Sequence, residues 1–403
     1  MKEKVVFRKH YLEKIRPFIG KSLIKIVTGQ RRIGKSYMLK QLIEEIKRSH
    51  PESNIIYIDK ELEEFSVLRN SEDLHRYVKV HLAEGKDNFL FIDEVQEIES
   101  FQRCLRSLLN QQECDIYCTG SNATMLSGEL ATLLAGRYIE FSIHGLSYLE
   151  FLEFNQIADS KENLNLYLTL GGMPFQYHLG LDSTIVFEYL KSLYSTILLK
   201  DVVSRENIRN VSLLENLVTY LADNTGSLFS AQNISKYLKS QQINLPPQSV
   251  INYLKALTNA YFIHKVPRAD IQGLKIFEIG EKFYFEDLGL RNSIRPFNYR
   301  GDIGKLMENA VYMHLRRNMD SVYVGKSGDK EIDFMAEKNG ERLYVQVTYQ
   351  LGDENIIHRE FGNLAAIPDN YPKYVVTMDE IQPRNTYKGI RQVNLKEFLA
   401  TTP

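Results

Sequence analysis

The chain has 403 residues, a hydrophobic fraction of 43%, a charged fraction of 25% and a formal net charge of -1 at pH 7. This composition is typical of a globular protein, and the length predicts about two to four domains. The near-zero net charge excludes a broadly basic chain, so a nucleic-acid surface would have to be a local patch.

Secretion, disulfide chemistry and membrane insertion are not indicated by the sequence. The three cysteines, Cys104, Cys114 and Cys118, lack the partners of a zinc site or a disulfide framework. The charged N-terminus does not resemble a signal peptide, and no apolar run reaches the roughly 18 residues of a membrane span. We therefore expect a cytoplasmic protein without membrane contact.

A short helix in residues 1–20 leads to an apolar strand at 23–27, and a phosphate-binding pattern follows. The pattern is G-x-x-x-x-G-K-S, and a helical periodicity begins at its end. Glycines permit close backbone approach, Lys35 would reach the β- and γ-phosphates, and the Ser36 hydroxyl would ligate Mg²⁺. The predicted nucleotide-binding residues are Gly29, Gln30, Arg31, Arg32, Ile33, Gly34, Lys35, Ser36 and Tyr37. We expect ATP as the ligand, although no base-reading motif separates ATP from GTP.

Two further strands carry polar residues at their ends. A strand at 54–59 precedes a Glu-rich helical stretch. The next apolar run, in residues 88–94, leads into two carboxylates, with Asp93 at the strand end and Glu94 directly after it. Asp93 would hold Mg²⁺, and Glu94 would orient and polarise the attacking water.

A fourth strand, 115–120, ends in Ser121 and Asn122, and Arg137 precedes a fifth strand at 138–143. Asn122 or Ser121 would sense the γ-phosphate, or the pair would cap the next helix. Arg137 is a candidate for stabilising transition-state charge, in the same chain or from a neighbouring subunit, and a surface arginine is the alternative.

Together these motifs resemble a large prokaryotic family of AAA-type ATPases with a C-terminal DUF4143-like region. The resemblance covers nearly the whole chain and rests on residues 28–36, 91–96, 119–122, 133–138, 145–151, 171–175 and 199–205. It implies a parallel sheet with the phosphate-loop strand near its centre, and a nucleotide-sensing or finger role for Arg137.

The region after the ATPase core shows two helical patterns. Residues 146–210 read as a helical lid that glycine and proline interrupt at 171–174. Residues 211–295 show a winged-helix pattern. Three helices, at 213–222, 231–239 and 247–259, are followed by two strands, at 261–266 and 274–279. Its basic residues are Lys236, Lys239, Lys255, Lys265, Arg268 and Lys275. Double-stranded DNA and a protein partner both remain open, because winged helices serve either role.

The last hundred residues resemble the PD-(D/E)xK nuclease fold. A helix at 304–317 carries Glu308, a strand at 331–336 carries Asp333, and a strand at 342–348 carries Gln346. Metal-dependent phosphodiester cleavage needs acidic ligands and a lysine, but Gln346 is a weaker ligand and Thr348 stands at the lysine position. We expect a degenerate site in which the fold is retained and nuclease activity is lost.

We therefore predict an α/β protein: an AAA-like P-loop ATPase core at 1–145, a helical lid at 146–210, a winged helix at 211–295 and a nuclease-like α/β domain at 296–403. The expected function is Mg²⁺-dependent ATP hydrolysis that rearranges the C-terminal region. The alternative is a nucleotide-gated DNA- or protein-binding scaffold with little turnover. No residue indicates the oligomeric state.

Overall fold

The computed structural model describes residues 6–126, 133–134, 136–271, 273, 276–296, 298–352, 354–380 and 386–401. Lys275 of the expected basic set, Ala135 of the 133–138 motif and the start of the expected strand at 274–279 lie outside these residues. The chain divides into two compact units. The N-terminal unit extends to His144 and includes Asn259–Tyr261, and the C-terminal unit contains the rest.

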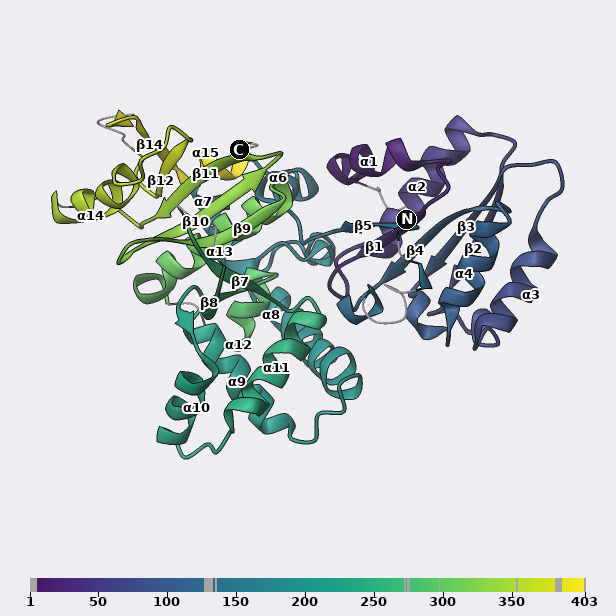
Figure 1. Cartoon of the computed structure of the whole chain (residues 1–403), viewed down its shortest axis with the longest axis horizontal. Coiled ribbons are helices and arrows are strands. Elements are labelled where there is room, and N and C mark those ends of the chain that lie inside the picture. Colours follow the sequence, from purple (N-terminus) through teal and green to yellow (C-terminus); the bar gives the residue numbers. More distant parts are fainter. Residues whose placement is uncertain are drawn as a thin grey trace. The chain divides into compact units, whose positions relative to one another are not determined.

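The N-terminal unit is built on a parallel sheet of five strands in the order β2-β3-β4-β1-β5 (Figure 1). Its strands are β1 (Ile24–Thr28), β2 (Asn54–Asp59), β3 (Asn88–Asp93), β4 (Asp115–Gly120) and β5 (Tyr138–Ser142). The α/β class and the phosphate-loop strand inside a parallel sheet are thereby confirmed. Strands β1, β3 and β4 are buried along almost their whole length, as expected for a parallel sheet covered by helices on each side.

Helices cover both faces of this sheet. The helices are α1 (Lys9–Ile15), α2 (Lys35–Ser49), α3 (Ser71–His81) and α4 (Phe101–Asn110), with 3-10 turns at Arg16–Phe18, Glu63–Phe65, Val95–Glu97 and Ala123–Leu126. One core joins α1 and α2 to one face, and a second joins α3 and α4 to the other. The carboxyl ends of the strands are left free to carry a site.

The C-terminal unit contains a mixed sheet of nine strands in the order β13-β14-β12-β11-β10-β9-β7-β8-β6. Its strands are β6 (Leu228–Phe229), β7 (Ile263–Asp270), β8 (Ile276–Phe285), β9 (Ser321–Ser327), β10 (Lys330–Lys338), β11 (Glu341–Val347), β12 (Lys373–Thr377), β13 (Thr386–Tyr387) and β14 (Ile390–Asn394). Strands β7 and β9 pair in parallel. This pairing joins the expected winged-helix and nuclease-like regions in a single sheet, so no break in the sheet separates the regions at residue 295.

Helices pack on the faces and edge of this sheet. They are α6 (Tyr148–Asn155), α7 (Lys161–Leu170), α8 (Ser183–Thr196), α9 (Val211–Asp223), α10 (Ala231–Ser240), α11 (Pro247–Asn259), α12 (Leu288–Ile294), α13 (Tyr299–Asn318), α14 (Glu354–Ala365) and α15 (Leu395–Ala400), with a 3-10 turn at Pro174–Leu179 and a π-helix at Ile197–Ser204. The largest core joins α6, α7, α13 and α15 to one face, and α14 covers the other.

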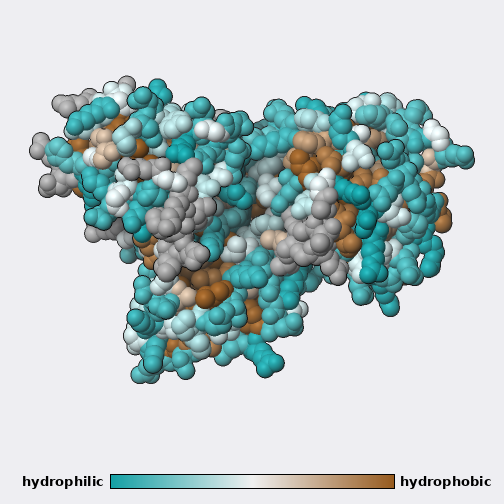
Figure 2. Space-filling view, in the orientation of Figure 1, coloured by the Kyte–Doolittle hydropathy of each residue, from teal (hydrophilic) through white to brown (hydrophobic). Residues whose placement is uncertain are grey.

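Among the described residues, no helix has the length and apolar character needed to cross a membrane. The face drawn in Figure 2 is mainly hydrophilic, with smaller hydrophobic patches on each unit. Within the π-helix, Asp201 is only 2% exposed and pairs with Arg205 at 3.4 Å.

Candidate functional site

The phosphate-binding pattern lies at the carboxyl end of β1 and runs into the first turn of α2. Gly29 has a φ of 147°, and a β-carbon there would lie 2.4 Å from the backbone oxygen of Ile143. Gly34 immediately precedes α2 with a φ of 99°, a left-handed conformation that favours glycine. Both glycines are therefore required by the backbone, and the loop directs the N-terminus of α2 toward the space above the sheet.

The other loop residues differ in burial. Ile33 is buried in the core and Arg31 nearly so, with its guanidinium 3.4 Å from Glu61. Gln30 is completely buried, and neither polar atom of its side-chain amide has a hydrogen-bond partner among the described residues. A buried amide without a partner costs free energy unless a ligand satisfies it. Arg32 and Tyr37 are exposed.

Lys35 is the charged centre of the loop. Its side chain is 4% exposed, and its ammonium lies 3.2 Å from the carboxylate of Glu94. The same ammonium donates to the backbone oxygen of Gln30 at 3.2 Å. The structure thus brings together two predicted catalytic groups: Lys35, at the start of α2 after β1, and Glu94, which follows β3. Strand β4 lies between β1 and β3 in the sheet.

Glu94 follows β3 in a left-handed conformation, with a φ of 55°. Its carboxylate accepts hydrogen bonds from the Gln96 amide and, at 3.0 Å, from the Ser121 hydroxyl. Burial alone would raise the pKa of Glu94, but the charge of Lys35 and the Gln96 hydrogen bond outweigh it and lower the pKa to about 2. Glu94 is therefore ionised at neutral pH, with its carboxylate fixed by three side chains.

Asp93 is 2% exposed and lies beside the loop. It accepts hydrogen bonds from the hydroxyls of Ser36 and Thr119. Thr119 also accepts from the Glu94 backbone nitrogen at 2.8 Å, so one β4 side chain positions both acidic residues. Burial raises the pKa of Asp93, and the two hydroxyl hydrogen bonds oppose that rise. The Ser36–Asp93 contact joins the two predicted Mg²⁺ ligands.

The two sensor candidates lie at the end of β4, and both are buried. Ser121 contacts Glu94, whereas Asn122 is 5% exposed at the next position. Sequence reasoning named Ser121 as an alternative, but it did not identify Gln96 or Thr119 as partners of the acidic pair. Their only signal was their position within three residues of a strand end.

Arg137 lies at the opposite edge of the sheet from the loop. Its backbone oxygen accepts from Ile24 at the start of β1, and its guanidinium donates to Asn110 at 3.0 Å. Strand β1 is five residues long, and at about 3.3 Å per residue it separates Arg137 from the loop by roughly 16 Å. The expected contact of Arg137 with nucleotide on the same chain is not supported. Arg137 precedes a parallel strand and so lies at the amino end of the sheet, whereas the phosphate-binding loop lies at the carboxyl end.

The degenerate nuclease-like residues also come together, within the C-terminal unit. Glu308 lies on α13, Asp333 on β10 and Gln346 on β11. The Gln346 side-chain oxygen accepts from the backbone nitrogen of Asp333 at 3.2 Å. Sequence reasoning missed two neighbours, Lys282 and Glu331: the Lys282 ammonium lies 2.8 Å from Glu308, 3.0 Å from Glu331 and 3.6 Å from Asp333.

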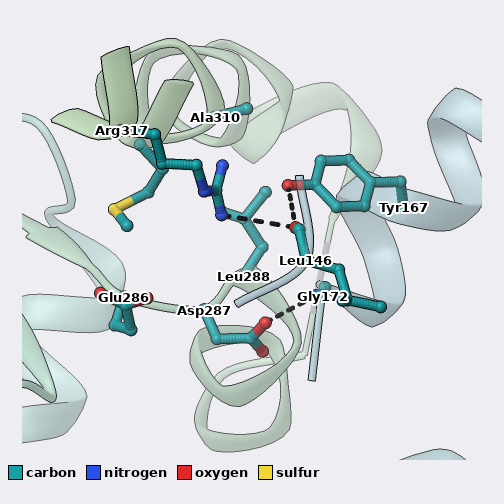
Figure 3. Close-up of a pocket in the computed structure, with 10 residues that line it drawn as sticks. Leu146, Tyr167, Gly172, Glu286, Asp287, Leu288, Ala310 and Arg317 are labelled. Atoms are coloured by element: carbon teal, nitrogen blue, oxygen red, sulfur yellow. Dashed lines mark hydrogen bonds between the residues drawn. The ribbon is translucent and has the colours of Figure 1, made fainter. Parts of the chain in front are cut away.

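Gly171 and Gly172, which interrupt the helices of residues 146–210, pack against the buried carboxylate of Asp287. Asp287 accepts from the Gly172 backbone nitrogen at 2.6 Å and from that of Leu290 at 2.9 Å (Figure 3). Burial raises the pKa of Asp287 to about 6 although backbone hydrogen bonds oppose it. The small pocket beside it is also lined by Tyr167 and Arg317, which both donate to the Leu146 backbone oxygen. These contacts hold the segments around Leu146, Gly172 and Asp287 together, so we interpret the pocket as structural.

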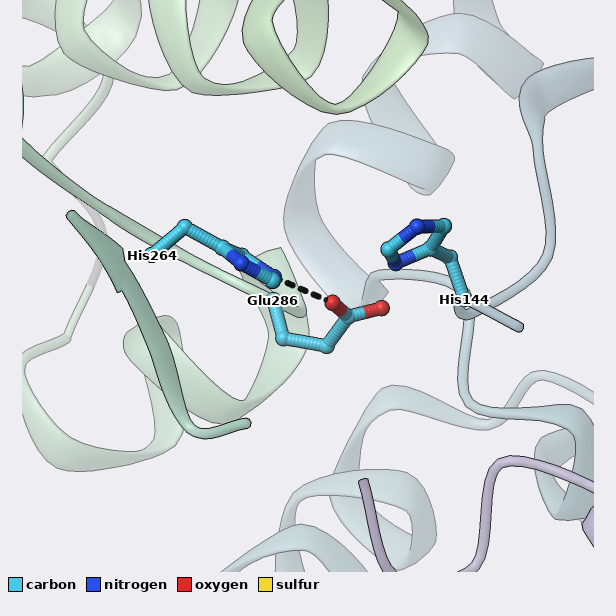
Figure 4. A group of neighbouring side chains, drawn as sticks. All are labelled: His144, His264 and Glu286. Atoms are coloured by element: carbon cyan, nitrogen blue, oxygen red, sulfur yellow. Dashed lines mark hydrogen bonds and ion pairs between the residues drawn. The ribbon is translucent and has the colours of Figure 1, made fainter. Parts of the chain in front are cut away.

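A second buried acidic group of the C-terminal unit is Glu286. Its carboxylate accepts from His264 at 2.5 Å and from the Gly145 backbone nitrogen at 3.0 Å (Figure 4). Both side chains are at most 10% exposed. The pair connects the end of β8 to the adjacent strand β7.

Comparisons with known proteins agree with the site geometry. Residues 21–152 match the family described as an AAA domain. Residues 161–300 match a domain of unknown function, DUF8612, where the sequence motifs resembled DUF4143. The AAA-type part of the resemblance is confirmed.

The chain is also similar to two curated relatives and, in fold, to a solved structure. An uncharacterized protein of Haemophilus influenzae is 33% identical over 387 residues, with 94% of each chain covered. An uncharacterized protein of Methanocaldococcus jannaschii is 30% identical, over 82% of this chain and 76% of the other. A solved Walker-type ATPase of Pyrococcus abyssi has a similar fold, with a TM-score of 0.53 and 14% identity over 73% of this chain and 97% of that chain.

Proposed function

Because the chain belongs to the AAA-type P-loop ATPase family, we propose that its N-terminal unit binds ATP and hydrolyses it with Mg²⁺. The observation that carries this proposal is the convergence of Lys35, Ser36, Asp93 and Glu94 at the carboxyl ends of β1 and β3. Parallel α/β sheets bind ligands at this edge.

The residues around the loop fit a nucleotide. Gly29 lets the start of the loop pack directly against the backbone of Ile143, and the unpartnered amide of Gln30 can bond to a ligand. The start of α2 and the ammonium of Lys35 favour phosphate groups. Ser36 and Asp93 would hold Mg²⁺, which offsets phosphate charge when bound.

In the proposed reaction, Lys35 exchanges its contact with Glu94 for the β- and γ-phosphates of ATP. The released carboxylate of Glu94 then accepts a hydrogen bond from water and directs its attack on the γ-phosphorus. Ser121 and Gln96 hold that carboxylate in place. Glu94→Gln tests the scheme: it should retain ATP binding and abolish turnover.

We also propose that the nucleotide state changes the packing of the C-terminal region, an order-and-hinge switch of the kind triphosphatases use. The π-helix at Ile197–Ser204 supports a hinge there, because π-turns are frequent at functional positions. Amide hydrogen exchange tests this: a non-hydrolysable ATP analogue should change protection in residues 146–210. Unchanged protection would contradict the switch.

The alternative function is a nucleotide-gated scaffold with little turnover. Wild type and Lys35→Ala would then release phosphate at the same rate while differing in ATP binding. ATP trapped by Glu94→Gln, together with turnover in wild type, would favour the enzyme.

A specific charge distribution favours double-stranded DNA as the partner. No aspartate or glutamate occurs between Asp223 and Asp270, and this stretch spans α10, α11 and most of β7. Its cationic residues are Lys236, Lys239, Lys255, Lys265 and Arg268. Lys265 pairs with Glu281, while Lys236, Lys239 and Lys255 are exposed. A local basic surface of this kind attracts phosphates even in a chain without net positive charge.

The exposed face of α11 adds groups that can read bases. Gln248, Ile251, Asn252 and Lys255 are exposed at helical spacing, and Gln248 donates to Asn252 at 3.1 Å. Side-chain amides match the major-groove edge of adenine. The order α9, β6, α10, α11, β7, β8, with β6 and β7 both antiparallel to β8, supports a winged-helix arrangement.

Fluorescence anisotropy with a labelled duplex tests the DNA proposal. Replacing Lys236, Lys239 and Lys255 by alanine should weaken binding and reduce its salt dependence, because counterion release scales with phosphate contacts. The matched control replaces the exposed lysines Lys9, Lys47 and Lys86 of the other unit. Equal losses of DNA affinity in the two triple variants would contradict a DNA-binding surface at these three lysines. That result would favour a protein partner for α11.

A further inference from the structure

The nuclease-like cluster consists of the carboxylates of Glu308, Glu331 and Asp333 and the ammonium of Lys282, which lies between them. The Lys282 ammonium contacts Glu308, Glu331 and Asp333 at distances of 2.8, 3.0 and 3.6 Å. Lys282 comes from β8, while the carboxylates come from α13 and β10. An ammonium carries three N–H donors, so it can satisfy three acceptors at once.

Several other polar groups of the cluster also have partners within the chain. The Tyr284 hydroxyl donates to Glu308 at 2.6 Å, and the Val347 backbone nitrogen donates to Asp333 at 2.8 Å. The side-chain oxygen of Gln346 accepts from a backbone nitrogen. These are the oxygens a divalent ion would need, since Mg²⁺ requires near-octahedral oxygen ligation.

The environment limits the space beside Glu308. Gly226 lies between α9 and β6, and a β-carbon there would lie 3.1 Å from the Glu308 carboxylate. The backbone at Gly226 therefore packs directly against this carboxylate. Lys282 itself is 3% exposed. An ammonium and a divalent ion this close together would repel strongly, because buried charges are poorly screened. The residues present therefore do not fit the metal that the nuclease resemblance implies.

We propose that the Lys282 ammonium is the resident cation of this cluster, in place of a metal ion, and that it ties β8 to α13 and β10. Three carboxylates surround one ammonium group in the cluster, and this excess of negative charge favours protonation of a carboxylate. Consistently, burial and the charge of Glu308 raise the pKa of Asp333 to about 7 although Lys282 opposes that rise. This inference is independent of ATP hydrolysis by the other unit.

Titration calorimetry with Mn²⁺, without nucleotide, tests the proposal on the full chain. Wild type and Asp333→Asn should give the same heats, because no metal binds at Asp333. Lys282→Met removes the charge at similar volume and should create a Mn²⁺ site, with affinity higher than wild type by roughly tenfold or more. Adding Asp333→Asn to Lys282→Met should remove that site.

Two outcomes would overturn the proposal. The first is a Mn²⁺ heat in wild type that Asp333→Asn abolishes, and the second is a folded Lys282→Met chain that gains no Mn²⁺ binding. Removing one partner of a buried ionic cluster is strongly destabilising, so Lys282→Met is also followed by thermal unfolding. A destabilised variant that Mn²⁺ restores supports the proposal, and Lys282→Arg, which keeps the charge, should fold and bind no Mn²⁺.

Discussion

The ammonium of Lys35 lies 3.2 Å from the carboxylate of Glu94, and both side chains are largely buried. In the proposed reaction these groups have different partners, phosphate for Lys35 and water for Glu94. Without nucleotide they neutralise each other. ATP binding therefore has to separate the pair, and this separation connects occupancy of the loop to the position of Glu94.

Glu94→Gln should uncouple binding from turnover. Glutamine keeps the shape of the side chain but cannot accept a proton from water, so turnover should fall about 100- to 10,000-fold. ATP affinity should be retained or increased, because Lys35 loses its carboxylate partner. Phosphate release and binding of a fluorescent ATP analogue measure the two effects. Wild-type turnover in this variant would rule out Glu94 as the base.

Ser121→Ala should lower turnover without weakening ATP binding. The Ser121 hydroxyl donates to Glu94 at 3.0 Å, and loss of a hydrogen bond to a charged group corresponds to roughly a tenfold effect. Ser121→Thr should restore the rate, and the exposed Ser66→Ala is the control. A change in KM alone would contradict a positioning role for Ser121.

Asp333 should make the C-terminal unit less stable as pH rises toward neutrality. The pKa of Asp333 is 3.8 when unperturbed and about 7 in the fold, so the folded state binds more protons between these values. The free energy of unfolding should fall across this window, by at most about 1.4 kcal/mol per pH unit. Asp333→Asn should reduce the slope in urea titrations, and the exposed Asp329→Asn should leave it unchanged.

Gly289→Ala should destabilise the C-terminal unit. A β-carbon there would lie 1.9 Å from the Leu170 backbone oxygen, so the end of α7 and the start of α12 would have to separate. We expect a loss of about 3 kcal/mol or more in urea unfolding. Gly304→Ala is the matched control, because nothing lies within 4 Å and alanine favours a helix. Similar losses of unfolding free energy in both variants would show that the close contact at Gly289 is not the cause.

The sequence predicts the phosphate site well because its residues are close in the chain or at strand ends. Gly29 to Ser36 form one loop, and Asp93 and Glu94 directly follow an apolar strand, so local patterns suffice. Strands β2 and β3 have the bounds expected from their apolar runs.

Other relationships depend on long-range packing that no local pattern encodes. Lys282 lies in β8 beyond the end of the strand expected at 274–279, and only the packing of β8 with α13 and β10 brings it to Glu308 and Asp333. From the sequence, Ser121 could sense the γ-phosphate or cap a helix, and only the packing of β3 beside β4 shows its contact with Glu94. Arg137 is different, since its position before a parallel strand was sufficient to place it away from the loop.

Phosphate release by the purified full chain tests the central claim most directly, with Lys35→Ala as the blank and Lys47→Ala, exposed on the same helix, as the control. We predict Mg²⁺-dependent turnover in wild type and Lys47→Ala that is lost in Lys35→Ala. Equal release from wild type and Lys35→Ala would contradict ATP hydrolysis by this site and leave nucleotide-gated binding as its function.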